Sequence, residues 1–278
     1  MGEAIVVGVD GSAGSRVAAD WAAVEALRDG VPLRVAHVSP VPDREQLTAW
    51  PYRLEPSAAP WAKLLAELHP GLRVEGVDHT GEVVPTLLSL AAGAGLLVLG
   101  TRGEGGPGGP AVGSVAHDVA VSAPGPVVLV PDGTGRAHGA HRRDQVVCGF
   151  DARDPAGAAA EFAFLAAERH GVRLRAVHAW RLPSPAARWM PYAVPEEDRG
   201  AWEDQEVQVL SDALVPWRER HPRVAVQPDV VLKSPAAALT HASAAARLLV
   251  VGRGRGSLGA VAHAVLEQAA CPVAVVPG

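Results

Sequence analysis

Cysteine and lysine are both scarce in this chain of 278 residues, which has two cysteines and far more arginines than lysines. Cys148 and Cys271 have neither the spacing of metal ligands nor the abundance of a disulfide framework. Both lie in apolar, strand-like runs, so we interpret them as small core residues. The two lysines, Lys63 and Lys233, reflect a composition typical of coding in a GC-rich genome. Zinc-stabilised and disulfide-stabilised folds are therefore not expected.

The chain also lacks a strong net charge and a long apolar run. Its formal net charge is -5 and its pI is about 6.1, which gives no general electrostatic reason to bind nucleic acid or an anionic membrane. No apolar run approaches the roughly 20 residues that span a bilayer, and the N-terminal segment has no basic leader. The content of hydrophobic residues, 48%, is ordinary for a globular protein. We expect a cytoplasmic protein that binds neither nucleic acid nor membranes.

An internal repeat organises the sequence, because four apolar segments of the first half recur in the same order in the second half. The matched pairs are 5–10 with 146–151, 33–37 with 174–178, 96–100 with 248–252, and 126–131 with 272–277. Residues 133–144, between the copies, are polar and glycine-rich, as is typical of a linker. Histidines within the linker lack carboxylates at metal-ligand spacing. We predict two domains, 1–132 and 145–278.

The periodicity of each half indicates the α/β class. The strand candidates are short, rich in Val, Ile and Leu, and show little alternation, as in parallel strands that are covered on both faces. Alanine-rich segments with helical spacing lie between them, at 14–28, 82–92, 155–169 and 235–246. The repeated order predicts two tandem, five-stranded, doubly wound parallel-sheet domains of Rossmann-like type.

A doubly wound sheet binds ligands beyond the carboxyl ends of its strands, where the winding direction reverses. Asp10 ends the first strand candidate and Gly100 ends the fourth. If these strands are neighbours, Asp10 and the loop after Gly100 line one cleft. Asp10 is also a residue type that forms turns after strands, and the two roles are compatible.

The loop after Gly100 is rich in glycine and leads to a helix candidate that starts near Val115. Ser114 occupies the position expected for the helix N-cap, where free amides and the helix dipole favour an anion. The dipole contributes roughly 0.3–1 kcal/mol per charge at an exposed site, so several amides must act together to hold a triphosphate. A glycine-rich surface loop by itself can also be structurally neutral.

The spacing Gly100-x2-Gly103-x9-Gly113-Ser114 resembles the nucleotide loop of universal stress proteins, and it lies where that family has it, between the fourth strand and the last helix. Gly8-Val9-Asp10 and Ala36-His37-Val38 add to the resemblance, which covers nearly the whole chain as a tandem pair. The resemblance implies an adenine-nucleotide alpha-hydrolase-like fold. It also implies an intrachain pseudo-dimer, in which 127–130 meets 273–276 across a pseudo-twofold axis.

The resemblance further implies that the first domain binds ATP, with magnesium left open as a companion ion. The positions it assigns to the adenosine part are Gly8, Val9, Asp10, Val38, Leu99 and Gly100. The positions it assigns to the phosphates are Gly103, Gly113, Ser114 and Val115. We add Arg102 from its position alone, as a source of a charge-assisted contact. The stretch 104–110 differs from the commoner filling of this loop and contains two prolines.

The second copy is not equivalent, because the loop after Gly252 is six residues shorter than the loop after Gly100 and lacks the final Gly-Ser pair. We predict that the nucleotide site of this copy is lost or altered, and that its role is architectural. Asp151 is retained. Arg253 and Arg255 are interpreted as a solvated basic loop, with an anion or nucleic acid as the alternative ligand.

These patterns favour an ATP-binding, stress-response sensor or regulator whose protein partner the sequence does not identify. The chain has no Gly-x-x-x-x-Gly-Lys-Ser/Thr loop, nucleophile elbow or zinc signature, so slow ATP hydrolysis is the most that we expect. The alternative is a nucleotide-free scaffold of the same fold. An ATP-using ligase or pyrophosphatase is a third hypothesis, but the expected Ser-Gly-Gly-x-Asp loop is missing. Association of two chains into a homodimer stays open.

Two histidines and two tryptophans are predicted to have structural rather than catalytic roles. His37 and His178 end equivalent strands, and we interpret them as packed or hydrogen-bonded residues rather than catalytic bases. Trp50 and Trp189 follow the same strand in the two copies, and prolines near both disfavour regular structure. We interpret these tryptophans as anchors, with a part in a loop over the cleft as the alternative.

Overall fold

A computed structural model describes residues 3–40, 57–103, 111–133, 144–155, 157–182, 196–254 and 257–278. Trp50, Trp189, Arg255 and the stretch 104–110 lie outside the described residues. The chain divides into two compact units. The first takes its residues from Met1–Ala140, Arg253–Leu258 and Pro272–Pro277, and the second from His141–Gly252 and Gly259–Cys271.

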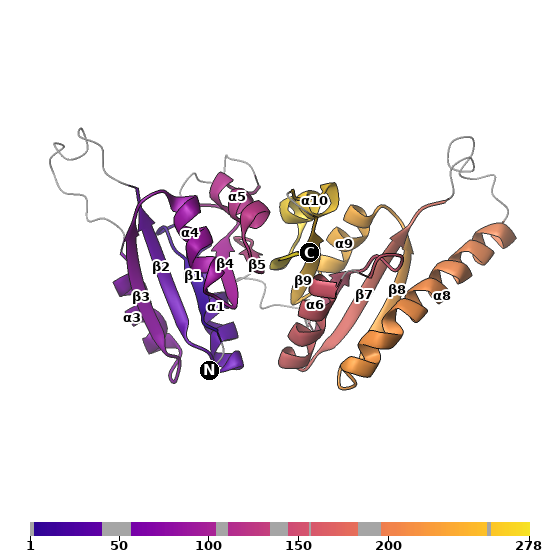
Figure 1. Ribbon diagram of the computed structural model, residues 1–278, viewed down its shortest axis with the longest axis horizontal. Helices are drawn as coiled ribbons and strands as arrows, with labels where there is room; N and C mark the ends of the chain where they lie inside the picture. The colour runs from indigo at the N-terminus through magenta and orange to yellow at the C-terminus, as the bar shows by residue number, and fades with distance from the viewer. Residues whose placement is uncertain are drawn as a thin grey trace. The chain divides into compact units, whose positions relative to one another are not determined.

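The first unit is a parallel sheet whose strands alternate with helices along the chain (Figure 1). Its elements are β1 (Ile5–Gly8), α1 (Ala13–Asp29), β2 (Leu33–Ser39), α3 (Ala58–Leu68), β3 (Val74–Thr80), α4 (Val83–Ala92), β4 (Leu96–Gly100), α5 (Ser114–Ser122) and β5 (Val127–Val130). The strand order is β3-β2-β1-β4-β5 with every pair parallel. Because β1 lies between β2 and β4, the winding direction reverses between β1 and β4, so the expected neighbourhood of these strands is confirmed.

Small side chains allow α1 to pack closely on this sheet. Ala18, Ala22 and Ala26 are fully buried on the helix face that contacts β1, β4 and β5. The side chain of Ser12 caps the start of the helix by accepting a hydrogen bond from the amide of Ser15 at 3.0 Å. Gly30 ends the helix with a φ of 66°, a left-handed conformation that favours glycine. The turn after β1 and the helix that follows it are therefore fixed by local sequence.

The last strand of the second repeat belongs to the first unit. β10 (Val273–Pro277) pairs antiparallel with β5, with Val273 opposite Leu129 and Val275 opposite Val127. The expected meeting of 127–130 with 273–276 is confirmed. Both strands are buried along nearly their whole length, so the edge of β5 is covered rather than exposed to other chains.

The second unit repeats the strand order of the first. Its elements are β6 (Gln145–Gly149), α6 (Gly157–His170), β7 (Arg173–Trp180), α8 (Glu196–Arg220), β8 (Val226–Leu232), α9 (Pro235–Ser243), β9 (Leu248–Arg253) and α10 (Ala260–Gln268). The strands lie in the order β9-β6-β7-β8, all parallel, which matches β4-β1-β2-β3. One difference is large: α8 has 25 residues and runs beside β8, whereas α3 has 11.

All four helical segments expected from the sequence are present as α1, α4, α6 and α9, with different ends. The segment with helical spacing at 235–246 forms α9, which ends at Ser243. The hydroxyl of Ser243 donates to the carbonyl of Thr240 at 2.6 Å and accepts from the amide of Ala270 at 3.0 Å. These contacts tie the last turn of α9 to the segment that follows α10. The apolar period of the sequence carried no sign of them.

The cysteines are core residues, as predicted. Cys148 lies in β6 and Cys271 lies two residues before β10; both are buried and neither forms a disulfide. Burial disfavours the thiolate and raises the pKa of Cys148 to about 12. At neutral pH this thiol is therefore a poor nucleophile and a poor metal ligand.

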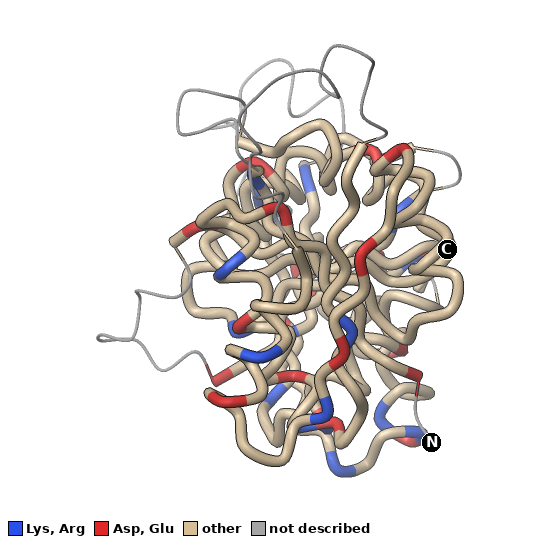
Figure 2. The backbone as a smooth tube through the Cα atoms, turned by 90° about the vertical axis from the view of Figure 1, so that its left-hand side faces the viewer, with Lys and Arg blue, Asp and Glu red and all other residues tan. Residues whose placement is uncertain are grey.

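Charged residues of both signs are mixed along the described backbone (Figure 2). Several are paired, including Arg175 with Asp229, whose guanidinium nitrogen and carboxylate oxygen lie 2.7 Å apart across β7 and β8. Cross-strand pairs of this kind favour the observed register. Among the helices of the described ranges, none combines the length and the apolar character that a membrane crossing needs.

Candidate functional site

A cavity of about 420 Å³ opens beyond the carboxyl ends of β1 and β4 in the first unit. All eleven residues predicted from the sequence line it, namely Gly8, Val9, Asp10, Val38, Leu99, Gly100, Arg102, Gly103, Gly113, Ser114 and Val115. They come from β1 and the turn after it, β2, β4, the loop after β4 and the start of α5. The cavity therefore lies where the winding of the sheet reverses, and its volume is within the range of small-molecule sites.

Asp10 stands at one side of the cavity in a fixed turn. Its Oδ1 accepts a hydrogen bond from the amide of Ser12 at 3.0 Å, which holds the chain between β1 and α1. The other carboxylate oxygen, Oδ2, lies close to Gly103, where an added Cβ would sit 2.6 Å from it. The turn-forming role and the cavity-lining role of Asp10 therefore coexist in one side chain.

The loop after β4 returns to the cavity through backbone hydrogen bonds. The amide of Thr101 donates to the carbonyl of Val130 at 3.0 Å, and the carbonyl of Thr101 accepts from the amide of Gly113 at 2.8 Å. The two ends of the loop are thus held side by side, with Gly103 and Gly113 both in the cavity wall. Thr101 itself is buried, so this junction is part of the packed interior.

The start of α5 differs from the prediction in one respect. Gly113, rather than Ser114, is the N-cap, with an extended backbone and no side-chain cap hydrogen bond. The carbonyl of Gly113 accepts from the amide of His117 at 2.9 Å, which makes Ser114 the first helical residue. Because the first amides of a helix have no intrahelical acceptor, those of Ser114, Val115 and Ala116 are suited to donate to an anion placed at the helix start. All three residues line the cavity.

The inner part of the cavity is apolar and tightly built. Val9, Leu87 and Leu99 are buried, and Val38 is 9% exposed. An added Cβ on Gly8 would lie 2.6 Å from a methyl group of Leu99. Side chains of this kind suit a flat, apolar ring rather than a charged group.

Arg102 faces its own loop as well as the cavity. Its Nε donates to the carbonyl of Ala111 at 3.3 Å, and its Nη1 lies 4.0 Å from Oδ2 of Asp132. The side chain is 35% exposed, so it is free to exchange the distant carboxylate for a stronger anion. The guanidinium is thus available for the charge-assisted contact that the sequence predicts, and it also braces the loop.

His37 is buried behind the cavity wall. Its Nδ1 lies 2.8 Å from the carbonyl oxygen of Val9, and its Nε2 lies 3.2 Å from Oγ of Ser39. Because a carbonyl can only accept, Nδ1 carries the proton and Nε2 accepts from the serine hydroxyl. The ring therefore fixes the end of β1 against β2, in agreement with its interpretation as a hydrogen-bonded residue.

Six further residues line the cavity and were not singled out from the sequence: Ser15, Ala36, Val83, Leu87, Thr101 and Ala116. Val83 and Leu87 come from α4 and are one helical turn apart, a spacing that places both on one face. That spacing was visible in the sequence. The sequence did not show that α4 reaches the cavity, because this depends on how α4 packs across β1, β2 and β4.

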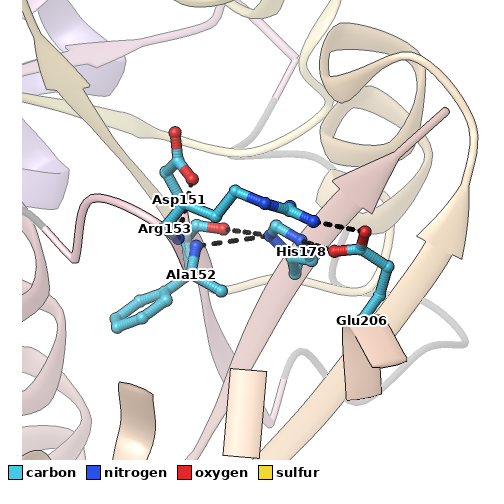
Figure 3. A network of polar contacts seen from close by, with 6 residues as sticks. Asp151, Ala152, Arg153, His178 and Glu206 are labelled. Atoms are coloured by element: carbon cyan, nitrogen blue, oxygen red, sulfur yellow. Dashed lines mark hydrogen bonds and ion pairs between the residues drawn. The ribbon is translucent and has the colours of Figure 1, made fainter. Parts of the chain in front are cut away.

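The second repeat carries a separate cavity of about 620 Å³, lined entirely by residues of the second unit. Asp151 stands at its edge, with Oδ1 accepting from the amide of Arg153 at 3.0 Å, the same turn that Asp10 makes. Arg153 in turn donates to Oε1 of Glu206 at 2.5 Å, and Oε2 of Glu206 lies 3.1 Å from Nε2 of His178 (Figure 3). Glu206 belongs to α8 and has no counterpart among the predicted site residues.

Arg253 has a structural partner. Its Nη1 donates to the carbonyl of Ala120, in the last turn of α5, at 3.1 Å, and both residues belong to the first unit. Burial of the guanidinium lowers the pKa of Arg253 from its usual range. A cation at a helix C-terminus is favourable. Because Arg253 is partly buried and hydrogen-bonded there, its interpretation as part of a solvated basic loop is wrong.

The fold and the cavity together define an α/β protein of the doubly wound type with a ligand-sized site at the reversal of its sheet. The model of the Universal stress protein family matches residues 1–131 and 142–277. Universal stress protein Rv1996 of Mycobacterium tuberculosis is 34% identical over 98% of this chain and 94% of its own length. A universal stress protein of Mycolicibacterium smegmatis is 33% identical over 98% and 96%. The chain belongs to the Universal stress protein family.

Solved structures agree on the fold. The crystal structure of a universal stress protein from Archaeoglobus fulgidus has a TM-score of 0.65 at 17% identity, covering 99% of this chain and 96% of that one. A functionally unknown protein from Pseudomonas aeruginosa PAO1 has a TM-score of 0.67 at 14% identity, covering 99% and 92%. At these identities the likeness concerns the fold alone.

Proposed function

We propose that this universal stress protein binds ATP in the first unit and acts as a nucleotide-dependent stress-response sensor or regulator in the cytoplasm. The observation that carries the proposal is the convergence of Asp10, an apolar inner wall and the start of α5 on one cavity. A carboxylate at the end of a strand suits ribose hydroxyls, and helix-start amides suit phosphates. The spacing of these groups in the wall therefore supports a nucleotide rather than a smaller anion.

The described cavity wall can accommodate such a ligand without a change in backbone conformation. The amide of Gly113 is bound to the carbonyl of Thr101, so, unlike the sequence prediction, the phosphates are expected to meet the amides of Ser114 and Val115, and Gly103 leaves room beside Oδ2 of Asp10. Arg102 supplies a mobile positive charge at the phosphate end. If magnesium accompanies ATP, phosphate oxygens would supply most of its ligands, since the described ranges hold no cluster of three His, Cys, Asp or Glu residues suited to a metal ion.

The wall supports binding more than fast hydrolysis. Asp10 is the one carboxylate among the described lining residues, and one of its oxygens is committed to the amide of Ser12. His37 is held by Val9 and Ser39 rather than directed into the cavity. A base free to activate water is therefore not among the described lining residues, and any turnover is expected to be slow.

Isothermal titration with ATP tests this proposal through a matched pair of variants. Gly113 and Gly259 are the N-caps of α5 and α10, both with extended backbone that any residue adopts. An added Cβ meets nothing closer than 3.6 Å at Gly113 and nothing within 4 Å at Gly259, so both variants should fold. We expect one ATP per chain, loss of binding in Gly113→Val, and unchanged binding in Gly259→Val. Absence of heat at millimolar ATP in the unchanged protein would favour the nucleotide-free scaffold.

A further inference from the structure

The helix that begins at the first cavity has, near its other end, a carbonyl whose regular partner is missing. α5 spans Ser114–Ser122, and in a regular helix the carbonyl of Ala120 would accept a hydrogen bond from the amide of residue 124. Residue 124 is proline, which has no amide hydrogen. This acceptor therefore has to be satisfied by water or by a donor from another part of the chain.

Arg253 of the second repeat supplies that donor. Its Nη1 donates to the carbonyl of Ala120 at 3.1 Å, although the two residues are 133 positions apart in the sequence. A guanidinium stays protonated in proteins, so it brings a full positive charge to the C-terminal end of α5. Arg253 is the last residue of β9 and is partly buried, which reduces the screening of this charge by water and salt.

The other end of α5 is the anion site of the first cavity. Ser114, Val115 and Ala116 line the cavity, and their amides have no acceptor within the helix. At a rise of about 1.5 Å per residue, Ala120 lies about 9 Å along the helix axis from Ser114. A cation at the C-terminus offsets the negative end of the helix dipole, so the positive end acts on an anion with less opposition. Arg253 is not among the described residues that line the cavity, so its effect on an anion there passes through α5.

The contact between a cation of one repeat and the last helix of the other runs in one direction only. Thr101 is the position equivalent to Arg253, because the two residues directly follow the matched segments 96–100 and 248–252. Thr101 is uncharged and buried, and its carbonyl accepts from the amide of Gly113. This position therefore offers no charge to α10, the corresponding helix of the second repeat. The repeat that keeps the long glycine loop is the one whose last helix receives the charge.

We propose that Arg253 is a positioning residue for the phosphate end of the nucleotide site in the first unit, acting through α5. The inference rests on the proposed function, because it requires that the start of α5 holds the phosphates of ATP. It gives the second repeat a part in nucleotide binding, in addition to covering the edge of β5 with β10. The first site is then complete only in the tandem chain.

Replacement of Arg253 separates its charge from its packing. Arg253→Met keeps an apolar stem and removes the charge, whereas Arg253→Lys keeps the charge. Both variants are titrated with ATP and with adenosine at a temperature where circular dichroism shows them to be folded. Amide NMR follows the adenosine titrations, because it also measures millimolar affinities. Arg223→Met is the matched control, since Arg223 pairs with Glu168 and its side chain is 84% exposed. If Arg253→Met does not fold, Arg253→Gln replaces it with a neutral donor for Ala120.

In Arg253→Met we expect ATP to bind about fivefold more weakly, which is about the largest effect of one charge at an exposed helix end. Adenosine, which has no phosphate, should bind as it does to the unchanged protein. Arg253→Lys should restore most of the ATP affinity, and Arg223→Met should alter neither ligand. A loss that adenosine shares equally, or that Arg253→Lys does not reverse, would overturn the proposal, because a general structural role would explain it.

The two proposals about the first site fail in different ways. If the unchanged protein binds ATP and Arg253→Met binds it equally tightly, the positioning role of Arg253 is overturned and the proposed function stands. If the unchanged protein does not bind ATP at all, both are overturned.

Discussion

Oδ2 of Asp10 and the Cα of Gly103 are so close that an added Cβ on residue 103 would lie 2.6 Å from the carboxylate oxygen. The carboxylate cannot simply rotate away, because its Oδ1 accepts from the amide of Ser12 at 3.0 Å. This single contact joins the loop after β4 to the turn after β1. Both residues line the cavity, so the contact lies in its wall.

Gly103→Ala should therefore weaken ATP binding by at least tenfold, because either Asp10 or the loop must move. Thermal stability should fall only slightly, since the backbone of Gly103 has no left-handed φ. Gly133→Ala is the control, because an added Cβ there meets nothing within 4 Å. Isothermal titration of both variants measures the effect, and equal affinity in the two would contradict the assigned wall.

Asp10→Asn separates the two roles of this side chain. The amide oxygen of asparagine can still accept from Ser12, so the turn and the melting temperature should be preserved. Loss of the negative charge should weaken ATP binding by about tenfold, or roughly 1.4 kcal/mol, if the carboxylate holds ribose hydroxyls. Asp10→Ala should lose the turn as well and lower the melting temperature. If both variants bind ATP with unchanged affinity, Asp10 only stabilises the turn and does not contribute to binding.

Arg253→Ala should destabilise the first unit by about 1–2 kcal/mol, because the carbonyl of Ala120 loses a charge-assisted hydrogen bond at the end of α5. Chemical denaturation measures the free energy of unfolding. Arg223→Ala is the control, since Arg223 pairs with Glu168 but its side chain is 84% exposed. A larger loss in the control than in Arg253→Ala would contradict the structural role of Arg253.

The ion pair of Arg153 with Glu206 predicts a specific pH dependence. The pKa of Glu206 is lowered in the folded state, first by the hydrogen bond from Arg153, so its contribution to stability is complete above the unfolded pKa of about 4.3. The contribution is lost as the pH falls through the lower, folded pKa. Glu206→Gln should therefore lower the melting temperature at pH 7 and differ less from the unchanged protein near pH 3.

Glu75→Gln provides the comparison for that series. Glu75 pairs with Arg34 at 3.4 Å, but its side chain is 67% exposed, so its removal should change little at any pH. A Glu206→Gln variant whose deficit is the same at pH 7 and pH 3 would show that the loss comes from packing rather than from ionisation.

The repeated apolar segments made the architecture predictable. Strands such as 5–8 and 96–100 were recognisable because they are buried on both faces, and their parallel order brought Asp10 beside the loop after Gly100. The pairing of β5 with β10 was implied by the family resemblance and not by the apolar pattern. The individual site residues were assigned by the same resemblance, with the exception of Arg102, which was added from its position in the loop.

Other features depend on contacts that local sequence does not encode. Gly113 rather than Ser114 is the N-cap, and its amide is bound to the carbonyl of Thr101 at the other end of the loop. Arg253 reaches Ala120, which lies in the other repeat. The contact of Glu206 with His178 requires the length of α8, whose sequence has many polar residues and no clear apolar stripe. Each of these features became visible only through tertiary structure.

If ATP binds at the start of α5, the backbone amides there must change on binding, and an amide NMR titration with ATP measures this most directly. Large shifts are expected for Gly103, Ser114 and Val115, saturating together at one ATP per chain. The equivalent amides at the start of α10, Ala260 and Val261, should not move. Saturating ATP that shifts the α10 amides, or leaves those of α5 in place, would contradict the account.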